Sequence, residues 1–121
     1  MDDSVATVEQ LKDAVREFCE ERDWDQFHNP KDLAIGMVTE ASELLEILRF
    51  KSPKDVEEMM ADPVRSAHIG EELADVFYFV LRFAERNGFD LCTELNRKLT
   101  INAEKYPVER CSGKNLKYNE Y

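Results

Sequence analysis

Four acidic side chains occur in two similar pairs within apolar, helix-like stretches of this chain. Glu40 and Glu43 form an E-x-x-E pattern in "TEASELLE", and Glu72 and Asp75 form an E-x-x-D pattern in "EELADVFYF". A spacing of three residues brings both members of each pair to neighbouring places on one helix face. Clustered carboxylates repel one another and take up protons unless cations neutralise them. The two pairs therefore predict a site for a hard cation, Mg²⁺ or Mn²⁺, because oxygen ligands suit these ions better than zinc.

A helical wheel, drawn at about 100° per residue, shows that the acids of "TEASELLE" are not equivalent. Glu40 falls within the apolar stripe of its helix, Glu43 lies at the edge of that stripe, and Glu46 faces away from it. The same construction places Glu72 in the apolar stripe of the later helix, with Asp75 at its edge. The apolar neighbours of the two inward acids are Leu33, Met37, Leu44 and Ile47 for Glu40, and Ile69, Val76, Phe79 and Phe83 for Glu72.

Two other interpretations of these inward acids fit the sequence less well. Ordinary salt bridges on the helix surface predict Lys or Arg three or four residues from each acid, and none stands there. A di-iron carboxylate centre requires a Glu-x-x-His pattern on two helices. The only histidines, His28 and His68, do not follow a Glu by three residues. A site for Mg²⁺ is the preferred interpretation.

The elements expected to position these acids are helices. Apolar periodicity and start or stop signals predict four long helices, while strand-like alternation is absent. The segment from Ser52 to Met60 is interpreted as a helical turn inside a connection, and the tail as irregular. We predict an oligomeric all-α four-helix bundle whose helices run from near Thr7, over Pro30–Phe50, over Pro63–Asn87 with Gly88 as a left-handed stop, and from about Asp90 to Lys105.

Length, charge and cysteine content narrow the class of protein. The 121 residues predict one domain over 1–121, with a core at about 7–106 and a polar tail at about 107–121. A formal net charge of −10 argues against a general binder of nucleic-acid polymers. Three cysteines without C-x-x-C spacing suggest neither a disulfide framework nor a zinc site. With no basic-apolar leader and no apolar run long enough for a membrane span, we expect a soluble cytoplasmic protein.

A magnesium site of this kind favours chemistry on a phosphate ester. Mg²⁺ held by a few carboxylates keeps positions open for water and for substrate phosphates. The chain has no G-x-x-x-x-G-K-[ST] loop, so metals would have to replace that phosphate cradle. Lys98, Asn102 and Lys105 share one face of the last predicted helix, where they would meet phosphate or, equally well, form a solvated face.

Several aromatic residues could stack against a nucleotide base. Trp24 and His28, flanked by polar residues in "RDWDQFHNP", suggest a binding site. For Phe50 and Phe79, packing in the core is the stronger expectation.

Three stretches together resemble a known family. "ERDWDQFHNPKDLAIGMVTEASELLEILRFK", "EELADVFYFVLRFA" and "KLTINAEKYP" are similar to the MazG-like all-α nucleoside triphosphate pyrophosphohydrolases, above all to their dCTP pyrophosphatase branch. The likeness covers nearly all of Glu20 to Pro107. In that family, E-x-x-E followed on the next long helix by E-x-x-D is the metal motif.

The resemblance implies hydrolysis of dCTP or a related nucleotide between the α and β phosphates, giving the monophosphate and pyrophosphate. It implies that Glu40, Glu43, Glu72 and Asp75 bind Mg²⁺ and carry catalysis. It places Trp24, His28, Phe50 and Phe79 around the base and sugar, and Lys98, Asn102 and Tyr106 near the phosphates or enclosing the nucleotide. Family members also assemble as homodimers or homotetramers whose helices complete one another's pockets.

Departures from the family pattern leave alternatives open. Thr39 stands where many members have a further Glu, and Phe50 and Phe79 stand where dCTP-selective relatives carry a Trp and a Tyr. Phenylalanine keeps stacking but loses the indole N–H and phenol O–H, so base selectivity is less well defined than the reaction. The alternatives are a broad-specificity enzyme that removes non-standard nucleotides, a nucleotide-binding module without turnover, and a purely structural bundle. The general base is unassigned, with Glu43 as a candidate for orienting the water.

Overall fold

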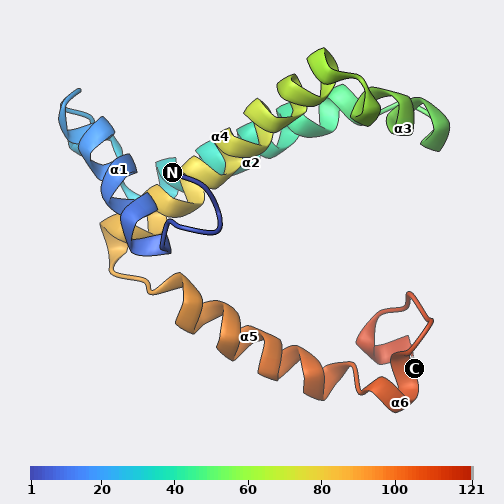
Figure 1. Ribbon diagram of the computed structural model, residues 1–121. Helices are drawn as coiled ribbons and strands as arrows, with labels where there is room; N and C mark the ends of the chain where they lie inside the picture. The colour runs from blue at the N-terminus through green and yellow to red at the C-terminus, as the bar shows by residue number, and fades with distance from the viewer. Residues whose placement is uncertain (121) are drawn as a thin grey trace. The chain divides into compact units, whose positions relative to one another are not determined.

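The computed structural model describes residues 1–120, and every regular element in that range is helical (Figure 1). The prediction of an all-α protein is therefore confirmed. The five longer helices are α1 (Val8–Glu20), α2 (Pro30–Leu48), α3 (Pro53–Ala61), α4 (Pro63–Asn87) and α5 (Leu91–Lys105). The short elements are the 3-10 turns η1 (Asp25–Phe27) and η2 (Tyr118–Glu120) and the single-turn helix α6 (Val108–Cys111).

Side-chain caps explain where the main helices begin and end. The Thr7 hydroxyl accepts a hydrogen bond from the backbone N–H of Gln10, and the Asn29 side chain accepts one from that of Asp32 at 2.9 Å. Gly88 ends α4 in the left-handed region, at φ 73°. These predicted boundaries are confirmed, whereas α2 ends at Leu48, two residues earlier than expected.

Two local predictions are wrong. The segment after Ser52 is a nine-residue helix, α3, and not a helical turn. Ser52 and Asp55 form a reciprocal capping box, and Pro53 occupies the first turn, so the local start signal is strong enough to carry two turns. The tail is also less irregular than expected, because α6 and η2 lie within it.

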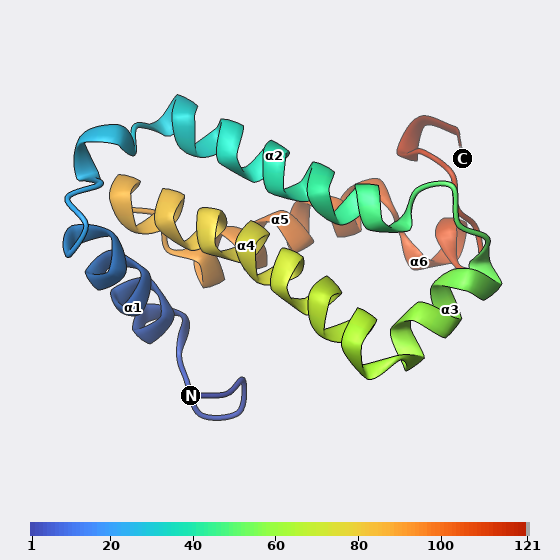
Figure 2. The ribbon, with the colours of Figure 1, turned by 90° about the horizontal axis from the view of Figure 1, so that it is seen from above.

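The chain divides into two compact units, residues 1–88 and the residues from 89 onward. In the first, α4 is the central helix: it runs antiparallel to α2 along much of its length and also packs against α1 and α3 (Figures 1 and 2). In the second, α5 leads to α6, and the Lys105 ammonium lies 5.0 Å from the centre of the Tyr118 ring. The single-domain prediction stays a prediction.

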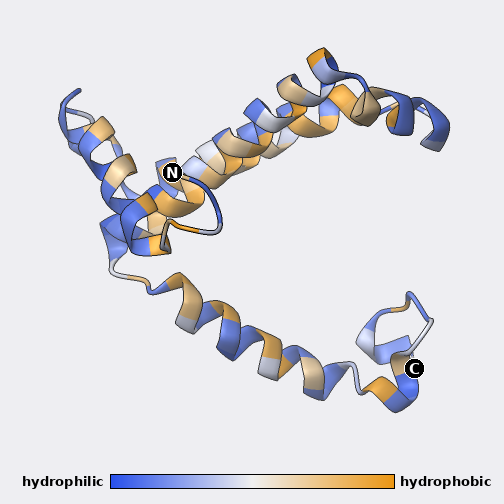
Figure 3. Cartoon of the chain, viewed as in Figure 1, coloured by the Kyte–Doolittle hydropathy of each residue, from blue (hydrophilic) through white to orange (hydrophobic). Residues whose placement is uncertain are grey.

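The apolar core of the described chain is small. Its buried apolar residues are Cys19, Leu33, Met59, Ile69, Leu81 and Ala84. Figure 3 shows apolar residues along both α2 and α4, while α3 is largely hydrophilic. Many large apolar side chains of this helix pair stay exposed, among them Ile35, Val38, Leu45, Leu73 and Phe77. Apolar faces of this kind mark interaction surfaces.

Within residues 1–120, no helix combines the length and apolar character needed to cross a membrane.

A glycine allows α2 and α4 to approach one another. A Cβ atom added at Gly36 would lie 2.3 Å from Cε1 of Phe79, far inside van der Waals contact. The Phe79 ring meets Tyr78 edge to face, with ring centres 5.0 Å apart, which limits its freedom to move aside. Gly36 therefore makes room for an aromatic ring at the helix contact, one turn before Glu40.

We predict that Gly36→Ala lowers the free energy of unfolding by about 1–2 kcal/mol, since overpacking outweighs the higher helix propensity of alanine. Gly70→Ala is the matched control, because nothing lies within 4 Å of a Cβ at that helical position. It should stabilise the protein by about 0.5–1 kcal/mol through propensity alone. Urea unfolding of both variants measures the difference, and equal effects would contradict the close approach.

Candidate active site

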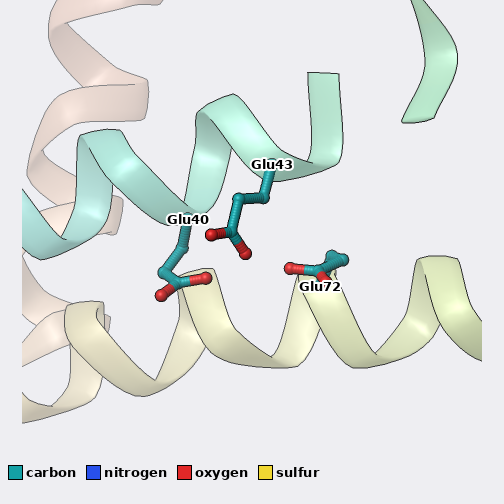
Figure 4. A group of neighbouring side chains, drawn as sticks. All are labelled: Glu40, Glu43 and Glu72. Carbon is teal, nitrogen blue, oxygen red and sulfur yellow. The ribbon is translucent and has the colours of Figure 1, made fainter. Parts of the chain in front are cut away.

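Three of the predicted acids meet between the two central helices. Glu40 and Glu43 project from α2 and Glu72 from α4, so that their carboxylates face one another (Figure 4). One oxygen of each lies within 4.8 Å of an oxygen of the other two. Glu40 and Glu72 are partly buried, and Glu43 is exposed. The wheel thus predicted correctly which acids turn inward and which one lies at the edge.

The other acids of the two motifs are arranged differently. Asp75 is exposed and does not belong to the three-acid cluster, but its charge acts on both Glu40 and Glu72. Glu46 pairs with Arg49 at 3.0 Å, as expected for a residue that faces away from the apolar stripe.

Burial and mutual repulsion make the cluster electrostatically unfavourable. Burial is the largest cause that raises the pKa of Glu40 above its ordinary value of 4.5, and repulsion from Glu43 and Asp75 raises it further. Burial likewise raises the pKa of Glu72, together with a hydrogen bond shared with Glu43. That bond needs a proton on one of the two groups, because two ionised carboxylates can only accept.

The cluster has the chemistry of a divalent metal site. When the acids are ionised, Oε2 of Glu72 is buried and finds no hydrogen-bond partner in residues 1–120. A buried carboxylate oxygen without a donor is costly, and a cation between the three groups would satisfy it. All the ligand atoms on offer here are carboxylate oxygens, which suit hard ions. The residues present therefore fit a divalent metal ion.

A chain of aromatic contacts links the predicted base-binding residues to the helix that carries Glu72. The Trp24 ring meets His28 and Phe18 edge to face, with ring centres 6.1 and 5.7 Å apart. Phe18 meets Tyr78 at 6.2 Å, and Tyr78 meets Phe79. The structure thus joins Trp24, His28 and Phe79 in one aromatic cluster, with Phe79 one turn beyond Asp75 on α4.

Phe50 lies elsewhere and is not a core residue. Its side chain is 88% exposed, which corrects the expectation of core packing, and Arg49 stacks on the ring. Its backbone has φ 62°, a left-handed conformation that is unusual for a bulky residue and clusters at functional sites. Phe50 follows the C-terminus of α2, whereas Trp24 and His28 precede the N-terminus of this helix, which is about 28 Å long. One copy of the chain does not bring these aromatic residues together.

The three remaining predicted residues belong to the second unit. Lys98 and Asn102 lie on α5, with Lys98 exposed and Asn102 partly buried, and Tyr106 follows the last turn. The Tyr106 ring meets Tyr118 edge to face at 6.4 Å. Their proximity to the acids stays a prediction.

One structural group escaped the sequence analysis. Arg82 is fully buried within α4, where it contacts His28, Asp25 and Glu85. The signal was an arginine between the apolar residues of "FVLRFA". The helical wheel places position 82 about 80° from Glu72, outside the apolar stripe, so periodicity alone does not show its burial.

Comparison with known proteins gives one consistent result. Residues 35–120 match the MazG-like family. The chain is 34% identical to dCTP pyrophosphatase 1 of Rattus norvegicus over 94% of its length and 67% of the relative's, and 33% identical to that of Homo sapiens over the same shares. A crystal structure of a pyrophosphatase from Archaeoglobus fulgidus is similar, with a TM-score of 0.76 and 34% identity over 82% of this chain and 91% of that one.

We predict that Glu72→Gln raises the melting temperature of the metal-free protein at neutral pH, because the amide removes one repelling charge and can donate to Glu43. A raised carboxyl pKa gives stability that is complete below the ordinary 4.5 and is lost as the pH rises through the folded-state pKa. The advantage of the variant should therefore grow as the pH rises above the ordinary value of 4.5.

The same variant should lose most of the rise in melting temperature that Mg²⁺ gives the unaltered protein. Thermal unfolding in EDTA and in MgCl₂ measures both effects. Glu46→Gln is the control, since it removes an acid of α2 that pairs with Arg49 outside the cluster. A destabilised metal-free Glu72→Gln with an undiminished response to Mg²⁺ would contradict a metal site here.

Proposed function

The chain belongs to the MazG-like family, and we propose that it is a Mg²⁺-dependent enzyme that hydrolyses dCTP or a modified dCTP to the monophosphate and pyrophosphate. Its class, nucleoside triphosphate pyrophosphohydrolase, follows from this family and from relatives named dCTP pyrophosphatase and pyrophosphatase. The single observation that carries the proposal is the meeting of Glu40, Glu43 and Glu72 between α2 and α4.

The proposed metal ligands are the four acids of the two motifs, Glu40, Glu43, Glu72 and Asp75, and Mn²⁺ would serve as a substitute for Mg²⁺. A bound ion of this kind polarises phosphoryl oxygens and lowers the pKa of a bound water. The buried, unpartnered oxygen of Glu72 supports its assignment as a ligand. Water forms the new bond to the α-phosphorus, the bond to the bridging oxygen breaks, and pyrophosphate leaves with that oxygen.

Glu43 is the proposed residue that orients the attacking water. It is the exposed acid of the cluster, so its carboxylate can accept a hydrogen bond from a water molecule while Glu40 and Glu72 remain partly buried. An oriented water is a requirement of in-line attack, and the carboxylate is also a suitable proton acceptor.

Aromatic side chains would hold the base and sugar of the nucleotide. Trp24, His28 and Phe79 lie in one aromatic cluster, and exposed Phe50 offers a free ring face beside Arg49. The proposed phosphate contacts are Lys98, Asn102 and Tyr106 of the second unit. A base pocket lined by Phe50 and Phe79 would discriminate by stacking and shape, without the N–H and O–H donors that would fix the edge of one particular base.

A homodimer or homotetramer would unite the separated aromatic residues. Phe50 and the pair Trp24 and His28 flank opposite ends of α2, so a pocket that contains all three needs a second copy of the chain. The small core and the exposed apolar side chains along α2 and α4 support such an assembly. We expect it to act in the cytoplasm on small nucleotides and not on nucleic-acid polymers, in line with the net charge of −10.

Two other functions would give different results in an assay with dNTP substrates. A broad-specificity enzyme that removes non-standard nucleotides would use the same acids with little preference between bases. A binding module would bind dNTP without turnover, yet the three clustered carboxylates, intact and turned toward one another, favour catalysis.

We predict that a dNTP panel with Mg²⁺ gives monophosphate and pyrophosphate, with dCTP or a modified dCTP turned over fastest. Glu40→Gln should lower kcat at least 100-fold, because it removes a charge that the metal requires. Glu46→Gln, the matched control on α2, lies outside the cluster and should stay within about threefold of the unaltered enzyme. Ion chromatography identifies the products, and release of orthophosphate would contradict the proposal, as would calorimetric binding of dCTP without any product.

Subunit mixing tests whether one site is built from two copies. Trp24→Ala and Phe50→Ala should each be nearly inactive alone, since each substitution would alter every site. After subunit exchange, one of the two sites in a mixed dimer combines the intact Trp24 of one chain with the intact Phe50 of the other, so about a quarter of full activity should return. No recovery after exchange, or a monomer in sedimentation equilibrium, would contradict a shared site.

A further inference from the structure

Arg82 of α4 lies at the centre of a buried polar network that none of the proposed chemistry uses. Its side chain has an exposed fraction of 0%, although the neighbouring buried residues of this helix, Leu81 and Ala84, are apolar. Its terminal nitrogens donate to Glu85, which follows by three residues, and to Asp25 of η1. Its Nε–H donates to Nδ1 of His28 at 2.8 Å.

The contact at Nε has a strict chemical consequence for His28. An arginine guanidinium in a protein is always protonated and offers donors without an acceptor. Nδ1 of His28 must therefore present a lone pair to it, which excludes both the imidazolium and the neutral tautomer with hydrogen at Nδ1. The ring is left neutral, with its hydrogen at Nε2. Only the Nε2–H edge of His28 is then available to a ligand, and it can donate but not accept.

Burial and the positive charges around His28 act in the same direction. Burial is the largest cause that lowers the pKa of the ring, and the positive charges of Arg82 and Arg86 lower it further, while Asp25 opposes them. Arg86 lies on the same helix as Arg82, and its Nη1 is 3.7 Å from Oδ2 of Asp25. The Trp24 ring, which meets His28 edge to face, carries no charge. A neutral His28 is thus maintained by burial and by the arginines of α4, against the charge of Asp25 in η1.

We propose that Arg82 is a positioning residue that holds His28 in its Nε2–H tautomer, so that His28 serves the nucleotide as a hydrogen-bond donor and not as a general base. The part of this statement that concerns the nucleotide rests on the proposed function, whereas the tautomer does not. The acceptor would be an oxygen or ring nitrogen of the base or sugar. The proton of the attacking water would then be accepted by a carboxylate between α2 and α4, and not by His28.

The cost of burying Arg82 indicates that its role is not packing alone. Burying a guanidinium costs several kcal/mol of desolvation, and a well-packed apolar side chain is often as stabilising as a buried ion pair. An arginine at this position donates hydrogen bonds to His28 and to Asp25, which a leucine could not do. Through Asp25, the same side chain fixes the short η1 turn that carries Trp24 and His28 beside α4.

Nitrogen-15 NMR of the substrate-free protein tests the tautomer directly. The chain has two histidines, and exposed His68 serves as an internal reference in the same spectrum. We expect a pyrrole-type shift at Nε2 and a pyridine-type shift at Nδ1 of His28, unchanged from about pH 8 to about pH 6. A His28 with hydrogen at Nδ1, or one that becomes imidazolium within this pH range, would overturn the proposal whether or not the protein is an enzyme.

A paired substitution tests the role of Arg82. Arg82→Met combined with Glu85→Leu removes the buried charges together, since Glu85 is only 6% exposed and would otherwise be left unpaired. In this variant, His28 should become a mixture of tautomers with a higher pKa. Arg86→Met is the matched control, because it removes a neighbouring positive charge that contacts Asp25 but not His28. It should keep the Nε2–H tautomer, and loss of the tautomer in the control but not in the paired variant would overturn the assignment to Arg82.

Kinetics separate a donor from a base. His28→Gln keeps an N–H near the position of Nε2 but cannot take up a proton, whereas His28→Ala keeps neither property. We expect His28→Gln to lower kcat less than tenfold and His28→Ala to raise KM at least tenfold. Loss of a general base costs about 100-fold or more in kcat. An equal kcat loss of that size in both variants would therefore overturn the donor role, while the NMR result would still report the tautomer.

Discussion

The repulsion between carboxylates on α2 and α4 is the constraint on which the rest of the structure depends. Packing these helices brings Glu40 and Glu72 into a partly buried space beside Glu43, where burial alone already disfavours their charges. The helix contact must therefore be stabilised elsewhere. Gly36 contributes by admitting the Phe79 ring one turn away, and α1 and α3 contribute by packing on α4. The fold tolerates an unfavourable cluster because a cation can relieve it.

This arrangement divides the two central helices into regions with different tasks. Around Glu40 and Glu72 the ligand atoms are all oxygens, suited to a hard cation and phosphate. Further along α4, the Tyr78 and Phe79 rings lead through Phe18 toward Trp24, an apolar surface suited to a base. A nucleoside triphosphate is likewise charged at one end and aromatic at the other. The acids and the aromatic rings follow one another along α4 as the phosphates and the base do in the ligand, and this agreement supports a nucleotide more strongly than either region alone.

Sequence periodicity predicted the features that depend on one helix at a time. Spacing and caps gave the long helices and the inward direction of Glu40 and Glu72, because both follow from helical geometry and local hydrogen bonds. Predictions from spacing and caps failed for residues whose environment depends on contacts between distant segments of the chain. The burial of Arg82 depends on Asp25, 57 positions away, and the exposure of Phe50 depends on a left-handed turn after α2 that local propensity disfavours. The short α3 was not predicted as a helix because nine residues show little apolar periodicity, although the capping box at their start favours a helix.

Arg82 of α4 and the acid cluster between α2 and α4 differ in how their charges are compensated. Arg82 has its charge balanced within the chain by Asp25 and Glu85, so this part of α4 is electrostatically complete and can act as a rigid support. The acid cluster has no such partner in the described part of the chain, and a cation could neutralise it. A site that must bind and release a charged ligand benefits from this contrast. The network of Arg82, Asp25 and Glu85 holds the turn that carries Trp24 and His28, while the uncompensated acids would favour the binding of a cation.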